Sequence, residues 1–292
     1  MIRALEALTR LAAHRDVPIL IEGETGTGKT ILARHLHALS PRASGPFQSV
    51  PVAALEDTLA SSELFGHVAG AFTDARVSRA GGFLSAQHGT VFLDEIGKAS
   101  PAVQRKLLHA IEHCEITPVG SDRAVRVDAR VIAASNVPLA NAVAAGTFLQ
   151  DLYERFKVFR VWVPALRERR ADISLLVKRC VVQHATEMGA GYHAPAISNA
   201  LMSAFHDADW PGNLRELNGS IRRLLIDAGG APELTIAHCR DSLGWPDDLD
   251  ADAGPLTRER AMQALADADD NVALAARNLG VNRTTVYRAL GR

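Results

Sequence analysis

The decisive stretch of this sequence reads GETGTGKT and comprises Gly23, Glu24, Thr25, Gly26, Thr27, Gly28, Lys29 and Thr30. It follows an apolar run at 17–21 and precedes a helical pattern at 31–36. Its glycines let backbone N–H groups wrap a phosphate chain, and the next helix points its positive end at the same anion. Lys29 can reach the β- and γ-phosphates, and Thr30 can bind Mg²⁺. The alternative is an ordinary glycine-rich turn, but the strand–loop–helix order favours a nucleoside triphosphate site.

A second motif supplies two carboxylates. The apolar run at 90–93 ends in Asp94 and Glu95, as expected of a buried parallel strand whose carboxyl end faces the ligand. Asp94 can order the Mg²⁺ shell, and Glu95 can polarise the water that attacks the γ-phosphate. A solvated turn or a helix N-cap is the alternative for this pair taken alone. With the phosphate loop upstream, the sequence predicts hydrolysis of the nucleotide.

Composition bounds the class of protein. The chain has 292 residues, enough for two or three domains, and its 47% apolar and 22% charged residues are typical of globular proteins. A net charge of −1 excludes bulk basicity, so any nucleic-acid contact must be local.

Sequence features also predict the compartment. The cysteines Cys114, Cys180 and Cys239 fit no metal or disulfide spacing and are expected to be buried or half-buried thiols. Residues 1–10 follow an amphipathic helical pattern with charges where a signal peptide needs an apolar core. No uninterrupted apolar run is long enough for a membrane span, so a cytoplasmic location without membrane contact is expected.

The predicted organisation has four parts. Residues 1–165 alternate strands and helices, with further strands at 131–135 and 159–163, which predicts an α/β fold built on a parallel sheet. Residues 166–243 form a helical lid, with a helical pattern throughout from about residue 171. An acidic linker at 244–254 leads to a small all-α unit at 255–292.

The terminal unit has the pattern of a helix-turn-helix. Ala276 suits a close helix crossing, Gly280 suits the turn, and Val286 can lock the second helix. The second helix carries groups suited to base edges and phosphates, namely Asn282, Arg283, Thr284, Thr285 and Arg288. This pattern predicts binding to double-stranded DNA. The alternative is an amphipathic hairpin that packs on the lid.

Together these motifs resemble the bacterial enhancer-binding proteins, the NtrC-type AAA+ ATPases that activate sigma-54 RNA polymerase. The stretch from Ser62 to His67 followed by the GAFTDA segment at 70–75 resembles the GAFTGA loop of that family. The segments at 166–169 (LRER) and 210–217 (WPGNLREL) match further family landmarks, and the last unit is similar to a Fis-type DNA-binding domain. The implied fold is an AAA+ P-loop sheet with a helical lid and a small all-α helix-turn-helix domain.

The resemblance implies roles for residues that the motifs alone do not explain. Phe72 and Thr73 would contact sigma-54, Asn136 would sense the γ-phosphate, and Arg215 would be the lid arginine that reports nucleotide state. Arg155 would be an arginine finger that reaches a neighbouring subunit. That role implies a homo-oligomeric ring, usually a hexamer, with a dimer as the inactive form, and ATP and Mg²⁺ as cofactors.

The sequence departs from the family pattern at several positions. Pro51 stands where the family usually has the Asn that holds the catalytic Glu, and Ser135 stands where Thr is usual. Pro118 and Leu149 replace positions that are often Arg, and Asp74 replaces the second Gly of GAFTGA. These departures leave the phosphate chemistry in place and predict weaker coupling to the neighbouring subunit and to the partner.

The resulting expectation is an ATP-dependent transcriptional regulator that binds upstream DNA and remodels sigma-54 polymerase. One rival is a nucleotide-gated DNA-binding regulator with weak or no hydrolysis and no sigma-54 contact. Another is a generic AAA+ remodeller, against which the GAFTDA segment argues. No receiver or sensor domain precedes Met1, so regulation is expected from a separate protein, unless the chain is a fragment.

Overall fold

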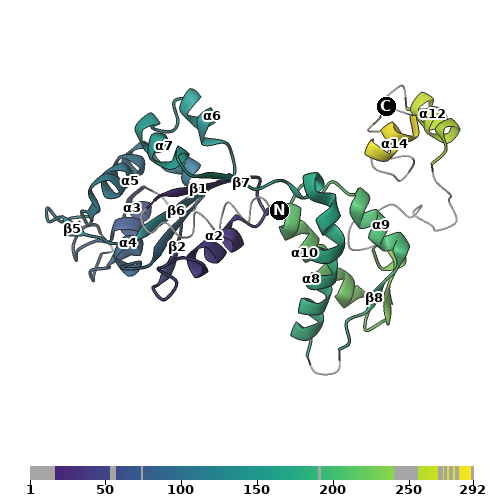
Figure 1. Ribbon diagram of the computed structural model, residues 1–292, viewed down its shortest axis with the longest axis horizontal. Coiled ribbons are helices and arrows are strands. Elements are labelled where there is room, and N and C mark those ends of the chain that lie inside the picture. The colour runs from purple at the N-terminus through teal and green to yellow at the C-terminus, as the bar shows by residue number, and fades with distance from the viewer. Residues whose placement is uncertain are drawn as a thin grey trace. The chain divides into compact units, whose positions relative to one another are not determined.

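The computed structural model describes residues 17–52, 57–73, 75–189, 192–239, 256–268 and 283–290, with the single positions 272, 275 and 279. The chain divides into two compact units, Met1–Pro164 and Ala165–Arg292 (Figure 1). The predicted amphipathic pattern at 1–10 and the predicted linker at 244–254 lie outside the described residues. The four-part division of the chain therefore stays a prediction.

The first unit is built on a parallel five-stranded sheet, as predicted. Its strand order is β2-β3-β6-β1-β7, with β1 at Ile19–Glu22, β2 at Phe47–Pro51, β3 at Thr90–Asp94, β6 at Arg130–Ser135 and β7 at Arg160–Trp162. The sequence pattern did not predict β2. This strand lies at the edge of the sheet and ends in a proline, which edge strands tolerate, so it lacks a continuous apolar run.

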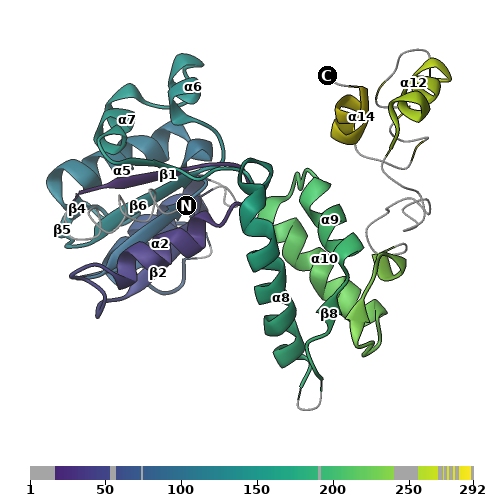
Figure 2. The ribbon, with the colours of Figure 1, turned by 45° about the vertical axis from the view of Figure 1, so that its right-hand side comes forward.

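Helices cover both faces of the sheet, because alternate strand residues point to opposite faces. Ile19, Ile21 and Phe92 pack against α2 (Lys29–Ala38). Leu20, Val91 and Leu93 belong to a second core on the other face, formed with α3 (Asp57–Phe65), α4 (Gly81–Ser85), α5 (Pro101–His113), α6 (Leu139–Ala144) and α7 (Gln150–Lys157). Figure 2 shows α2 on one side of the strands and α5, α6 and α7 on the other.

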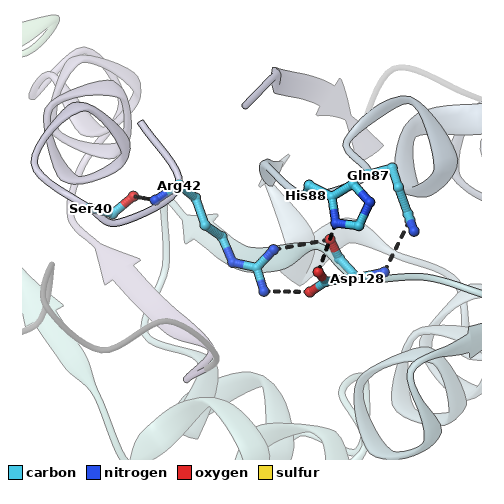
Figure 3. A network of polar contacts seen from close by, with 5 residues as sticks. All are labelled: Ser40, Arg42, Gln87, His88 and Asp128. Atoms are coloured by element: carbon cyan, nitrogen blue, oxygen red, sulfur yellow. Dashed lines mark hydrogen bonds and ion pairs between the residues drawn. The ribbon is translucent and has the colours of Figure 1, made fainter. Parts of the chain in front are cut away.

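A polar network links three loops, namely the loop after α2 and the loops that precede β3 and β6 (Figure 3). The buried Arg42, in the loop after α2, donates from Nη1 to the Asp128 carbonyl at 3.0 Å and from Nη2 to Asp128 Oδ1 at 2.5 Å. His88 Nδ1 lies 2.9 Å from Asp128 Oδ2, and Gln87 accepts the Asp128 N–H at 3.0 Å. The hydrogen bonds from Arg42 and His88 lower the pKa of the Asp128 carboxyl.

The second unit contains the predicted helical lid with its own core. It comprises the 3₁₀ helices η3 (Leu166–Asp172) and η4 (Ile236–Cys239) and the helices α8 (Ile173–Glu187), α9 (Asn199–Asp207) and α10 (Asn213–Asp227). The prediction of helix throughout was wrong at two short places, because β8 (Ala196–Ile197) pairs in parallel with β9 (Glu233–Leu234). Two-residue strands bury too little apolar surface to leave a period in the sequence.

Two family landmarks meet inside this unit. Asn213, fully buried with φ of 55°, accepts the Leu166 N–H through Oδ1 at 2.7 Å. Trp210, also at positive φ, donates its indole N–H to the Phe205 carbonyl at 2.8 Å and packs against that ring. The WPGNLREL segment therefore ties the start of η3 to the start of α10. Asparagine is among the residues that best tolerate a left-handed backbone.

The end of the chain contains two described helices, α12 (Arg258–Ala266) and α14 (Arg283–Leu290). Ala261 on α12 and Val286 on α14 are fully buried and belong to one small hydrophobic cluster. The predicted turn, with Ala276, Gly280 and Asn282, lies outside the described residues. The helix-turn-helix therefore remains a proposal.

The described residues bear on two expectations, the lack of a membrane span and the burial of the cysteines. Within those ranges, none of the helices has the length and apolar character that a bilayer crossing requires. Cys239 is buried and Cys180 half-buried, as expected, and burial raises the pKa of Cys239 to about 12. The expectation was wrong for Cys114, which is exposed and forms the C-cap of α5 with a left-handed backbone.

Candidate nucleotide-binding site

The loop between β1 and α2 has the backbone of a phosphate cradle. Gly23, Gly26 and Gly28 have φ angles of 154°, 80° and 100°, values that side chains disfavour. A Cβ at Gly23 would lie 2.5 Å from the Val163 carbonyl oxygen, so the loop needs glycine there. Gly28 is the N-cap of α2 and has no side chain to cap it. The first N–H groups of α2 are therefore suited to an anion.

Lys29 lies folded onto this loop. Its side chain is buried, and Nζ donates to the carbonyls of Gly23 at 2.7 Å and Glu24 at 2.9 Å. Thr27 is also buried and donates its hydroxyl to the Glu24 carbonyl at 2.8 Å. A buried ammonium beside the N-terminus of a helix concentrates positive charge at one place, and this arrangement fits a chain of phosphates. Thr25 is exposed at the turn, and Thr30 is half-buried in the first turn of α2.

The strand order brings the other predicted residues to the same edge of the sheet. β6 lies between β1 and β3, so Asn136, which follows β6, stands between the phosphate loop and the Asp94–Glu95 pair. The Gly23 N–H donates to the Ser135 carbonyl at 3.2 Å, which joins the loop to this edge. A Thr hydroxyl and an Asp carboxylate are oxygen ligands of the kind that Mg²⁺ prefers, so Thr30 and Asp94 fit that ion chemically.

Glu95 has a constrained backbone and a charged neighbour. Its φ is 55°, and its N–H donates to Asp94 Oδ1 at 3.0 Å. Lys98, at the end of η2 (Ile96–Lys98), donates from Nζ to Glu95 Oε2 at 2.7 Å. Pro51 is the register partner of Asp94 across the β2–β3 pair. Sequence reasoning did not single out Lys98, although its i+3 spacing from Glu95 was a usable signal.

Comparison with known proteins identifies the family. Residues 1–162 match the family described as the Sigma-54 interaction domain, and residues 167–245 match the AAA+ ATPase lid domain. This chain belongs to the sigma-54 interaction domain family. The recognition made from the motifs is thereby confirmed.

Curated relatives extend over most of the chain. The transcriptional regulatory protein ZraR of Salmonella typhimurium is 39% identical over 97% of this chain and 65% of its own length. The anaerobic nitric oxide reductase transcription regulator NorR of Klebsiella pneumoniae is 45% identical over 74% of this chain and 42% of its own length. This member of the sigma-54 interaction domain family thus spans slightly under two thirds of the length of ZraR.

Solved structures agree on the fold. NtrX from Brucella abortus in complex with ADP superposes with a TM-score of 0.77 at 30% identity, covering 99% of this chain and 67% of that chain. NtrX in complex with ATP gives a TM-score of 0.73 at 30% identity, covering 100% and 67%.

The GAFTDA loop of this sigma-54 interaction domain has a fixed base. His67 and Arg79 exchange two backbone hydrogen bonds of 2.9 Å each, and the Val68 N–H donates to the Val119 carbonyl at 3.1 Å. A Cβ on Gly81 would lie 2.2 Å from the Gly66 nitrogen, so these two backbones touch where the loop begins and ends. These contacts fix both ends of the loop where it leaves the first unit. The paired backbone at 66–68 and 79–81 is here called the pinned neck.

Phe72, a predicted sigma-54 contact, is not fully exposed. It is half-buried, and its ring meets the His67 ring edge-on, with the ring centroids 5.0 Å apart. His67 is itself held, because Nδ1 lies 2.7 Å from Ser62 Oγ and Nε2 lies 2.8 Å from the Val77 carbonyl. The pinned neck places an aromatic partner beside Phe72, which sequence alone could not indicate. Thr73 is exposed, and Asp74 lies outside the described residues.

The two predicted arginines of the site are both exposed. Arg155, on α7, pairs with Glu112 on α5, with Nε donating to Oε1 at 2.9 Å. Leu149 is the N-cap of α7, and Pro118 precedes the residue that supports the GAFTDA neck. Arg215 lies near the start of α10 in the second unit. Glu112 was not predicted, and no spacing in the sequence pointed to it.

Four of the five residues predicted to contact DNA lie on one short helix. Arg283, Thr284, Thr285 and Arg288 belong to α14, whose buried side carries Val286. The orientation of those four side chains and the position of Asn282 fall outside the described residues. Their contacts with DNA therefore stay a prediction.

Proposed function

We propose that this chain is the ATP-hydrolysing core of a sigma-54-dependent transcriptional activator. The observation that carries the proposal is the GAFTDA loop, which leaves a P-loop ATPase unit from a pinned neck. A P-loop fold by itself indicates only nucleotide chemistry. A loop that carries Phe72 and projects from that fold gives the chemistry a place to act on a partner protein. The match to the Sigma-54 interaction domain supports sigma-54 polymerase as that partner.

Each residue of the proposed site has a role in hydrolysis. The loop from Gly23 to Gly28 and Lys29 bind the phosphates, and the nucleotides named in the NtrX structures support ATP as the substrate. Bound Mg²⁺, held by Thr30 and Asp94, would neutralise charge on the phosphates. Glu95 accepts the proton of the attacking water. Asn136 would read the γ-phosphate.

The remaining predicted residues couple the chemistry to assembly and to partners. Arg155 would complete the site of a neighbouring copy, which requires a ring, and Arg215 would report nucleotide state to the lid. Phe72 and Thr73 would contact sigma-54. The α14 residues would bind double-stranded DNA upstream of a promoter.

A second candidate function is a nucleotide-gated regulator that hydrolyses ATP slowly. Two observations favour it. Pro51 stands beside Asp94, where the family usually has an amide, and Lys98 occupies Oε2 of Glu95. In that case nucleotide would chiefly set the oligomeric state.

One experiment separates these functions. Purified protein is incubated with sigma-54 polymerase, promoter DNA and ATP, and open complexes are counted by permanganate footprinting of the melted strand. ATP-dependent melting is expected, and ADP in place of ATP serves as the control. ATP hydrolysis without promoter melting would favour a remodeller with another target. DNA binding with neither activity would favour the nucleotide-gated regulator.

A further inference from the structure

Lys98 forms an ion pair with Glu95, the residue that would act as general base in the proposed hydrolysis. Lys98 Nζ lies 2.7 Å from Glu95 Oε2, and the Lys98 N–H also donates to the Glu95 carbonyl at 3.0 Å. Lys98 therefore contacts Glu95 through both its side chain and its backbone. The carboxylate is partly shielded, with 30% of the Glu95 side chain exposed.

The turn that carries Lys98 is fixed in place. Ile96 is fully buried in the core of the sheet. A Cβ on Gly97 would lie 3.1 Å from Ser135 Oγ, so the turn packs closely against the end of β6. Ser135 Oγ is held in turn by a 2.6 Å bond to the Val137 carbonyl. The ammonium of Lys98 is thus presented to Glu95 from a rigid base.

The residue that faces Asp94 across the β2–β3 pair cannot donate a hydrogen bond. Pro51, the register partner of Asp94, has an apolar ring without a hydrogen-bond donor. Lys98 supplies the donor from the other side, through the 3₁₀ turn. Glu95 is consequently oriented by an ionic contact within its own turn and not by an amide on the neighbouring strand.

We propose that Lys98 is a positioning residue that holds Glu95 in a resting orientation and so restrains hydrolysis. This inference rests on the proposed function. A general base must come within hydrogen-bond reach of the water whose proton it accepts. With one carboxylate oxygen engaged by Lys98, Glu95 must first break or share that contact. Lys98 thereby lowers turnover without touching the nucleotide.

Kinetics of the 292-residue chain test the restraint. Lys98→Ala is expected to raise kcat for ATP by about two- to fivefold, the size that an exposed ion pair can account for. KM is expected to stay unchanged, and Lys98→Arg should restore the low kcat because the guanidinium keeps the pair. Arg223→Ala, which removes an exposed intrahelical pair with Asp227 in the lid, is the matched control and should change neither constant.

A labelling experiment tests the pair without any turnover. Nucleotide-free protein is treated briefly with acetic anhydride, and acetylation of Lys98 is measured by mass spectrometry. Glu95→Gln should raise the labelling of Lys98, because loss of the carboxylate exposes the amine. Lys157, which pairs with Glu154 at the same i,i+3 spacing, should be labelled equally in both proteins.

The outcomes distinguish this inference from the proposed function. If the wild type hydrolyses ATP and Lys98→Ala is no faster, the restraint is wrong while the ATPase stands. If neither protein hydrolyses ATP, both ideas fail. Equal labelling of Lys98 in the wild type and in Glu95→Gln would overturn the ion pair as the means of restraint.

Discussion

Arg155 on α7 and Glu112 on α5 form an ion pair within one chain, with Arg155 Nε donating to Glu112 Oε1 at 2.9 Å. The arginine proposed to act on a neighbouring subunit therefore has an intramolecular partner at the surface. Because 54% of the Arg155 side chain is exposed, the pair is screened by water and contributes little to stability. Moving the guanidinium to a neighbouring site thus costs little.

The first prediction concerns catalysis between subunits. Arg155→Ala should reduce ATP turnover by roughly 10³-fold or more, because an arginine finger stabilises charge that develops in the transition state. Turnover per subunit of the wild type should rise with protein concentration, as measured by a coupled phosphate-release assay. Glu112→Ala breaks the same ion pair and is the matched control, since it should retain most of the activity. Equal losses of ATP turnover in both variants would show that Arg155 acts only as the ion-pair partner of Glu112.

The second prediction assigns the general base. Glu95→Gln should bind ATP as the wild type does and hydrolyse almost none, because an amide cannot accept the proton of the water. Binding is measured by titration with a fluorescent ATP analogue, and turnover by phosphate release. Glu63→Gln, at an acid paired with Arg79 beside the GAFTDA loop, is a control that should leave turnover intact. Normal hydrolysis by Glu95→Gln would show that another group is the base.

The third prediction concerns the GAFTDA loop. Phe72→Ala should abolish promoter melting with sigma-54 polymerase and leave ATP turnover unchanged, because the ring rests on His67 and not on the core of the sheet. Val77→Ala is a matched control on the same loop, where a largely exposed apolar side chain is shortened. Melting at the wild-type level by Phe72→Ala would rule out the loop tip as the contact.

The fourth prediction concerns DNA. Arg283→Ala should weaken binding to the operator by about 1–3 kcal/mol and relax the preference at one base pair if Arg283 reads a base edge. A uniform loss across sequences, with the salt slope smaller by about 1, would instead indicate a phosphate contact. Fluorescence anisotropy against a randomised operator pool measures both. Deletion of 255–292 is the complementary experiment, and binding that survives it would place the DNA site elsewhere.

The fifth prediction concerns stability and pH. Asp128→Asn should lower the unfolding free energy by about 1–2 kcal/mol, because it weakens charge-assisted bonds to the buried Arg42. The pKa of Asp128 is lowered in the folded state, so its contribution is complete above the unfolded value of about 3.9 and is lost as pH falls through the folded value. Thermal melts between neutral and acid pH measure this dependence. Asp122→Asn, at an exposed loop position, should leave the curve unchanged.

Local sequence was enough to predict the phosphate loop and the Asp94–Glu95 strand. Both depend on neighbouring residues, since glycines permit positive φ and a continuous apolar run specifies a buried parallel strand. The edge strand β2 escaped prediction because it is only partly buried and ends in Pro51. The two-residue strands of the lid escaped because they are too short to show a period.

Several contacts that hold the predicted side chains and the loops join segments that are far apart in the chain. Glu112 meets Arg155 across 43 positions, and Arg42 meets Asp128 across 86, so no local spacing reveals either pair. Phe72 rests on His67 because backbone pairing closes the neck of its loop. The sequence by itself determined which chemical groups line the proposed phosphate site, because that motif is contiguous. Only the tertiary structure decided which charged partners hold Arg155 and Asp128, because those partners meet only after the sheet and its helices have packed.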